Sequence, residues 1–150
     1  MEIFVDADAC PKVIKEVLYK TVQRRKIVMT LVADQYLKVP VSEYIRTIQV
    51  PSGIDSADEK IVELVTSGDL VITADIPLAD QVVSKGGFAI NPRGELYTEQ
   101  NIKERLAIRD MMADMRSCGL ELGGPPVFNQ KNREKFINQL DRFLTKVLNK

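Results

Sequence analysis

The first ten residues, Met1–Cys10 (MEIFVDADAC), decide the fold that we expect for this chain. Residues 3–5 form a short apolar run of types that favour strands, and Asp6 and Asp8 follow at once. Pro11, which is well suited to the first turn of a helix, comes next. Open α/β sheets bind ligands at the carboxyl ends of their strands. We therefore expect a buried strand that presents carboxylates at such an edge.

Similar strand and helix patterns alternate along the first two thirds of the chain. Helical spacing of apolar residues follows Pro11, Ser56 and Pro77, and buried-type strands are predicted at residues 2–6, 27–33, 70–73 and 88–90. Residues 34–46 are less clear, and we predict a short helix around Ser42–Arg46 followed by a short strand at Thr47–Val50. This alternation predicts a three-layer α/β/α fold with a mainly parallel sheet.

The last third of the chain is helical by pattern. Helices are expected at residues 98–116 and 130–148, joined by a loop rich in Gly and Pro at residues 118–129. We expect residues 1–150 to form one domain, with residues 98–150 packed on it as a C-terminal helical pair.

The composition excludes several classes of site. The chain has no histidine, which rules out Ser–His and Cys–His nucleophile pairs and histidine metal sites. Cys10 and Cys118 lack zinc-type spacing, and we interpret Cys10 as a packing residue. Two thiols, no secretory signal and no apolar run of membrane-spanning length predict a cytoplasmic protein with no membrane partner.

Acidic residues gather beside predicted strand ends and helix starts: Asp6, Asp8, Asp55, Asp58, Asp75 and Asp80. A doubly wound sheet would place Asp6 and Asp75 side by side, where their like charges repel unless a cation neutralises them. Carboxylates without histidine are ligands for a hard ion such as Mg²⁺ or Mn²⁺. The alternative for Asp55, Asp58 and Asp80 is that each caps a helix.

Four motifs resemble the bacterial YaiI/YqxD family: VDADACP at 5–11, DSADEKIVELVTSGDLVITADIPLA at 55–79, NPRGELYT at 91–98 and GGPP at 123–126. That family is similar to PIN-like domains, which include metal-dependent nucleases that cut RNA or DNA. The resemblance implies a PIN-like fold with an acidic metal pocket. It implies catalytic roles for Asp6, Asp58 (or else Asp55) and Asp75, with Asp8 and Asp80 as further metal ligands.

Basic residues fall mainly in the back of the chain. Residues 1–90 hold ten Lys or Arg and thirteen Asp or Glu, whereas residues 91–150 hold eleven and eight. Arg105, Arg109 and Arg116 project within about 40° of one another on an ideal helix. They form either a row that binds phosphates or a solvated face that pairs with nearby acids.

Two further sets of bases have different interpretations. The family motif makes Arg93 another candidate phosphate-binding residue. The bases of the last helix share one face, opposite its apolar residues, and we interpret that face as ordinary solvated surface: Lys131, Lys135, Arg142 and Lys146.

Three functions are consistent with this sequence. The first is a nuclease that uses Mg²⁺ or Mn²⁺ to cut single-stranded RNA or DNA. The second is a phosphatase of the haloacid-dehalogenase type, with Asp6 as nucleophile, Asp8 as the acid, and Lys60 or Lys85 as the lysine. The third is a metal- or RNA-binding module without turnover. The sequence does not predict the oligomeric state.

Overall fold

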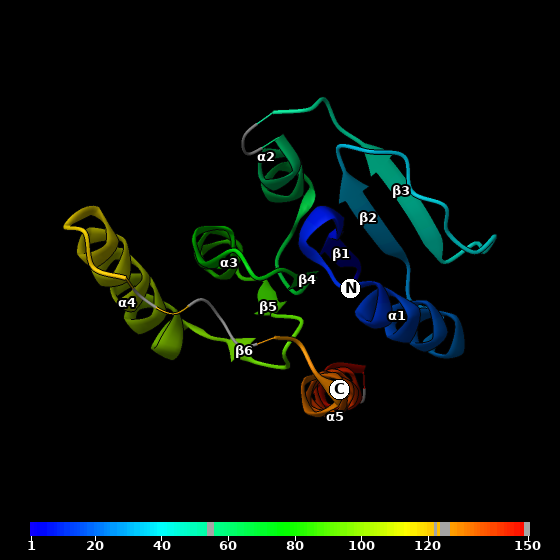
Figure 1. Ribbon diagram of the computed structural model, residues 1–150. Coiled ribbons are helices and arrows are strands. Elements are labelled where there is room, and N and C mark those ends of the chain that lie inside the picture. The colour runs from blue at the N-terminus through cyan, green and yellow to red at the C-terminus, as the bar shows by residue number, and fades with distance from the viewer. Residues whose placement is uncertain (54–55, 122, 124–126, 149–150) are drawn as a thin grey trace.

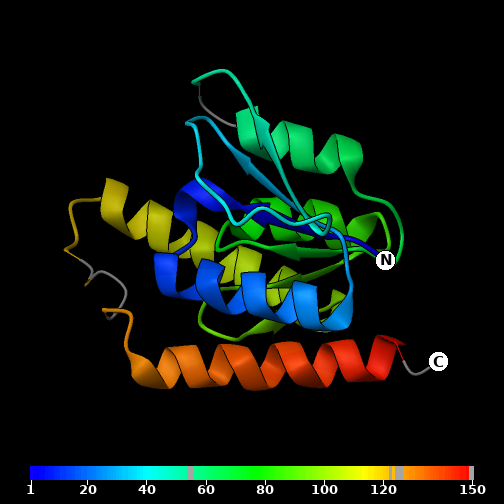
Figure 2. The ribbon, with the colours of Figure 1, turned by 90° about the vertical axis from the view of Figure 1, so that its right-hand side faces the viewer.

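The computed structural model describes residues 1–53, 56–121, 123 and 127–148, and its centre is a six-stranded sheet with helices on both faces (Figures 1 and 2). The strands are β1 (Ile3–Asp6), β2 (Met29–Ala33), β3 (Ile45–Gln49), β4 (Leu70–Ile72), β5 (Phe88–Ile90) and β6 (Leu96–Tyr97). The helices are α1 (Lys12–Arg25), α2 (Ser56–Leu64), α3 (Ile76–Ser84), α4 (Glu99–Ser117) and α5 (Gln130–Leu148), and a 3₁₀ turn, η1 (Ala7–Ala9), follows β1. The expected three-layer α/β/α fold is confirmed.

The strand order places β1 and β4 side by side in the middle of the sheet. The order is β3-β2-β1-β4-β5-β6, and every pair is parallel except β5 with β6. The chain builds β1, β2 and β3 outward in one direction and then returns to add β4 and β5 on the other side. The crevice between the carboxyl ends of β1 and β4 is therefore a topological switch point, where open sheets bind ligands.

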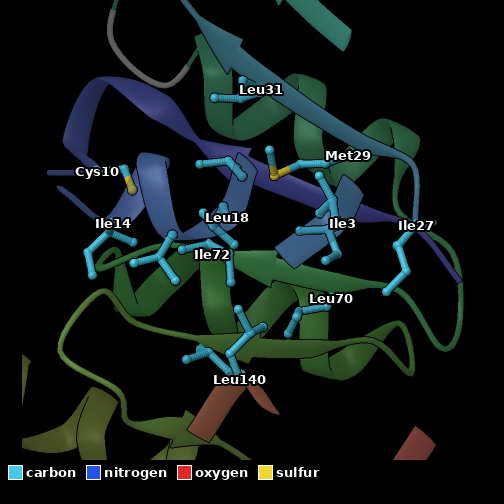
Figure 3. Close-up of a cluster of buried hydrophobic side chains, with 14 of the residues drawn as sticks. Ile3, Cys10, Ile14, Leu18, Ile27, Met29, Leu31, Leu70, Ile72 and Leu140 are labelled. Carbon is cyan, nitrogen blue, oxygen red and sulfur yellow. The ribbon is translucent and has the colours of Figure 1, made fainter. Parts of the chain in front are cut away.

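Alternating side chains of the strands divide the core into two main layers. Ile3 and Val5 face the layer of α1 and α5, whereas Phe4 between them faces α2 and α3. Figure 3 shows the first of these layers, in which strand residues such as Ile72 meet α1 and the Leu140 side chain of α5. Burial on both faces explains why these strands are almost uninterrupted apolar runs.

The two C-terminal helices are present and pack on different neighbours. Four α5 side chains join the core beside α1: Phe136, Leu140, Phe143 and Leu144. By contrast, α4 lies against α3 and fully buries Ile102 alone among its residues. Figure 1 shows the two helices on separate sides of the sheet. None of the helices in the described ranges has the length and apolarity needed to cross a membrane.

Two details of the predicted secondary structure differ from the observed one. The short helix predicted around Ser42–Arg46 is wrong, because β3 already begins at Ile45. The backbone N–H of Met29 donates to the Tyr44 carbonyl at 2.7 Å, so pairing with β2 extends the strand at the expense of local helix preference. The prediction also missed β6, a two-residue strand too short to show alternation.

Candidate active site

Asp6 and Asp75 meet at the switch point through the hydroxyl of Thr73. Thr73 Oγ1 donates to Asp6 Oδ2 at 3.0 Å, and the Asp75 backbone N–H donates to Thr73 Oγ1 at 3.0 Å. Asp6 is the last residue of β1, and Thr73 follows the last residue of β4. Parallel pairing of these strands thus brings together two carboxylates that lie 69 positions apart in the sequence.

Asp75 also caps α3. Its Oδ1 accepts a hydrogen bond from the Leu78 backbone N–H at 3.0 Å, and Pro77 occupies the first turn of the helix. Such a cap satisfies a backbone donor that the helix itself cannot pair, and the positive end of the helix dipole favours the carboxylate charge. The Asp75 side chain is therefore held in place by α3, the helix that it caps.

Asp6 is a buried carboxyl whose environment disfavours its charge. Its exposed fraction is 8% and that of Thr73 is 1%. Burial raises the pKa of Asp6, the hydrogen bond from Thr73 lowers it, and the nearby charges of Asp75 and Asp8 raise it further, with a raised pKa as the net result. A cation beside Asp6 would stabilise its charged form against the cost of burial and against repulsion from Asp75 and Asp8.

Asp8 supplies a third acid at the same edge. It is exposed in η1, and its Oδ2 accepts a hydrogen bond from the Asp34 backbone N–H at 2.9 Å. Asp34 follows the last residue of β2. The link fixes the turn after β1 to the carboxyl end of the neighbouring strand.

Arg109 of α4 stands beside these acids. A hollow of about 500 Å³ is lined by Asp6, Asp75 and Arg109 together with Ala9, Ala74 and Ile76. A second hollow of about 430 Å³ is lined by Asp58 and Glu59 of α2 and again by Asp75 and Arg109. Asp58 therefore shares a hollow with Asp75, but it does not line the one that contains Asp6. Arg109 also contacts its neighbour Asp110 at 3.2 Å.

The remaining predicted site residues lie in other settings. Asp80 pairs with Lys103 at 2.7 Å and ties α3 to α4, and Arg105 pairs with Glu95. Arg93, in the turn after β5, donates to Asn132 Oδ1 of α5 at 3.3 Å. Arg116 is exposed in the last turn of α4. Asp55 lies outside the described residues.

The sequence of the chain matches the uncharacterised YaiI/YqxD family over residues 4–146. The chain belongs to this family. A UPF0178 protein of Maridesulfovibrio salexigens is 57% identical over 150 residues, which cover 100% of this chain and 99% of the relative. A UPF0178 protein of Dechloromonas aromatica is 58% identical over 147 residues, 98% of each chain. No solved structure gives a significant match.

The acidic edge of this YaiI/YqxD member has the donor chemistry of a magnesium or manganese site. Within the described residues, Thr73 occupies only Oδ2 of Asp6 and Leu78 only Oδ1 of Asp75, so each carboxylate keeps an oxygen for a ligand. The same part of the chain contains no ready-made group of three metal-ligating side chains. Mg²⁺ is commonly bound by one or two carboxylates, with waters and substrate phosphates completing the octahedron. Asp6 and Asp75 fit that arrangement.

Sequence reasoning missed Thr73 as the residue that joins the two acids. Its signal was present, because a threonine that ends an apolar strand just before an aspartate can donate to a neighbouring strand. The partner of that hydrogen bond depends on strand order, and a single sequence does not contain this information directly. The sequence also does not reveal which of the three α4 arginines lies beside the acids. Of Arg105, Arg109 and Arg116, only Arg109 lines the hollow with Asp6.

Proposed function

We propose that this protein is a divalent-metal-dependent nuclease that hydrolyses phosphodiester bonds in RNA or DNA at the edge formed by Asp6 and Asp75. One observation carries the proposal: at the switch point of the sheet the Thr73 hydroxyl donates to the Asp6 carboxylate and accepts from the Asp75 backbone N–H, which links two acidic residues from distant parts of the chain. The pKa of Asp6 is raised, first by burial and then by the charges of Asp75 and Asp8, which is consistent with a functional site.

The acids would hold Mg²⁺ or Mn²⁺. Asp6 and Asp75 offer one carboxylate oxygen each, Asp58 lines the second hollow together with Asp75, and Asp8 adds negative charge nearby. Such an ion, when bound, lowers the pKa of a water and polarises a phosphoryl oxygen. Thr73 and the cap on α3 fix the two carboxylates before substrate arrives, so little reorganisation is needed.

Arg109 would position the scissile phosphate. Its guanidinium lines the hollow with Asp6 and Asp75, and arginine binds phosphate oxygens in a planar, bidentate geometry. Arg116 follows on the same helix and can meet a neighbouring phosphate of a single strand. Arg109 pairs with the exposed Asp110, Arg105 with Glu95, and Arg93 contacts Asn132, so each of these must exchange or share its partner to bind phosphate.

Neither lysine considered for the phosphatase alternative, Lys60 or Lys85, lines the two hollows beside Asp75. Lys60 pairs with Glu63 at 3.6 Å within α2, and Lys85 donates to the Val62 carbonyl at 2.6 Å. Lys85 caps the far end of α3 from Asp75, which places it at the opposite edge of the sheet. The nuclease proposal requires no lysine, and we therefore favour it.

Cleavage of labelled oligonucleotides tests the proposal. Purified protein with Mn²⁺ or Mg²⁺ should cut 5′-labelled single-stranded RNA or DNA, and Asp6→Asn should lower the rate by about 100-fold or more. Asp114→Asn, which removes an exposed acid of α4, is the matched control and should cut at the wild-type rate. No cleavage over a panel of metals and strands contradicts the proposal, and a phosphoryl group trapped on Asp6 supports the phosphatase instead.

The proposed substrate and compartment agree with one another. A nuclease for single strands with Mg²⁺ chemistry acts where nucleic acid and this ion are abundant, and we propose the cytoplasm. Both cysteines are free thiols, as expected in a reducing compartment.

A further inference from the structure

The outer face of α5 carries a row of unpaired cations. Lys131, Lys135, Arg142 and Lys146 are all exposed, and none of them makes an ion pair or hydrogen bond with another residue in the described part of the chain. On an ideal helix they project within about 60° of one another and extend over about 22 Å. We call these four residues the α5 stripe.

The charge of the stripe is not balanced by its own helix. Residues 130–148 contain five Lys or Arg and two acids, Glu134 and Asp141. Asp141 is already used on the α1 side, where it contacts Arg24 at 3.3 Å and Arg25 at 3.8 Å. Glu134 remains at the margin of the stripe. A soluble domain of zero net charge thus concentrates positive charge on one face.

Two hollows run along the stripe and share residues. The first is lined by Lys131, Lys135 and Arg142, with Glu134, Asn138 and Gln139. The second lies between α5 and the β5–β6 edge. Its polar residues are Thr98, Gln139, Arg142 and Lys146, and its apolar residues are Phe88, Leu96, Phe143 and Val147. Gln139 and Arg142 line both hollows, so the two hollows are neighbours along α5. Proteins contact phosphate oxygens with cationic side chains and with neutral amide or hydroxyl donors, and both kinds of group are present here.

The stripe leads away from the acidic edge. Arg93 leaves the carboxyl end of β5 and contacts Asn132 in the first turn of α5, so the Lys131 end of the stripe lies at the edge that holds Asp6. Only β4 separates β1 from β5, which amounts to about 10 Å at ordinary strand spacing. The other end of the stripe, at Lys146, lies beside Phe88 at the start of β5. Figure 2 shows α5 extending along the whole molecule at its outer side.

We infer that the α5 stripe binds the phosphate backbone of the nucleic-acid strand on one side of the bond that is cut at the acidic edge. The inference rests on the proposed function for the class of ligand. In this arrangement α5 binds the part of the nucleic acid that flanks the cleaved bond, and hydrolysis takes place in the β1–β4 crevice. The stripe then contributes affinity without touching the scissile phosphate.

Binding in EDTA tests this inference without cleavage. Fluorescence anisotropy of a 20-nucleotide labelled strand is measured against NaCl concentration for the wild type and for Lys135→Gln/Arg142→Gln. The double variant should bind about tenfold more weakly, and the slope of log affinity on log salt should fall by about 1.4, since each single-strand phosphate contact contributes about 0.7. Lys20→Gln/Lys38→Gln removes two exposed cations outside the stripe and should bind within about twofold of the wild type.

The outcomes separate the two proposals. Equal loss in both double variants, wild-type binding by the stripe variant, or binding to anionic lipid vesicles but not to the strand overturns the inference. If the stripe variant binds weakly and no protein cleaves any strand, the inference stands and the nuclease proposal fails. If the wild type cleaves and the stripe variant binds and cleaves equally well, the nuclease proposal stands and the inference fails.

Discussion

The Thr73 hydroxyl donates a 3.0 Å hydrogen bond to the buried carboxylate of Asp6, and so joins the carboxyl end of β4 to that of β1. This bond lowers the pKa of Asp6, whereas burial and the charges of Asp75 and Asp8 raise it. Because Thr73 also accepts from the Asp75 backbone, one side chain positions both acids of the candidate site.

Replacing Thr73 should therefore disturb both acids at once. Thr73→Val leaves the Asp6 oxygen and the Asp75 N–H without a partner, and we expect a loss of about 1–3 kcal/mol in the free energy of unfolding. Urea denaturation measures this loss. Thr73→Ser keeps the hydroxyl and is the control. The role given to the hydroxyl is wrong if the serine variant loses as much as the valine variant.

Asp6→Asn should stabilise the metal-free protein at neutral pH. The folded pKa of Asp6 is raised, so the stability that this carboxyl contributes is fully present below the unfolded pKa of 3.8 and is lost as pH rises through the folded pKa. The asparagine carbonyl can still accept from Thr73 and carries no charge. Urea midpoints in EDTA should thus favour the variant at pH 7 and converge toward pH 4. Mg²⁺ should then raise the midpoint of the wild type but not that of Asp6→Asn.

Arg109 should matter more for cleavage than Arg105. Both arginines have an ion-pair partner, Asp110 for Arg109 and Glu95 for Arg105, but only Arg109 lines the hollow with both acids. We expect Arg109→Gln to lower the cleavage rate by about 10- to 100-fold and Arg105→Gln by less than about threefold. Single-turnover cleavage at saturating protein measures the difference. Equal losses would contradict the placement of the scissile phosphate beside Arg109.

Gly94 should not tolerate a side chain. Its φ is +90°, and a Cβ there would lie 2.6 Å from the Lys135 carbonyl carbon and 2.7 Å from the Phe136 nitrogen, both backbone atoms of α5. We expect Gly94→Ala to cost about 2–4 kcal/mol in unfolding free energy. Gly119→Ala is a close control, because Gly119 has φ +87° but no atom within 4 Å of its Cβ position. Its expected cost is about 1 kcal/mol.

The two thiols should differ in reactivity. Cys10 is buried, and burial raises the pKa of its thiol to about 12, so it remains protonated at pH 8. Cys118 is exposed. Ellman's reagent at pH 8 should modify one thiol rapidly in native protein and the second only after addition of urea. Rapid modification of two thiols without denaturant would show that Cys10 is accessible.

The sequence predicted the alternation of strands and helices because the central strands β1, β2 and β4 are buried on both faces. Such strands are almost uninterrupted apolar runs, whereas β3 at the edge of the sheet is mostly exposed and lacks this signal. The same logic placed Asp6 and Asp75 at one edge, since parallel strands share their carboxyl ends. These features are encoded locally, and the tertiary structure agrees with the local preferences, so the prediction was correct.

Features that depend on long-range partners could not be predicted. Asp80 has the same local signal as Asp75, a carboxylate near a helix start, yet it pairs with Lys103 across the α3–α4 contact. β3 begins at Ile45 because β2 pairs with it, in a segment whose own pattern indicated a helix. The positions of α4 and α5 likewise depend on the elements that they pack against, α3 and α1, and not on the two helices alone.

The core joins the two ends of the chain. Ile3 and Leu144 belong to the same buried cluster, so the layer beside α1 is completed only when the last helix arrives. During synthesis, α5 leaves the ribosome after every strand that it covers. Until α5 is available, the apolar side chains of these strands are exposed and prone to association with other nascent chains.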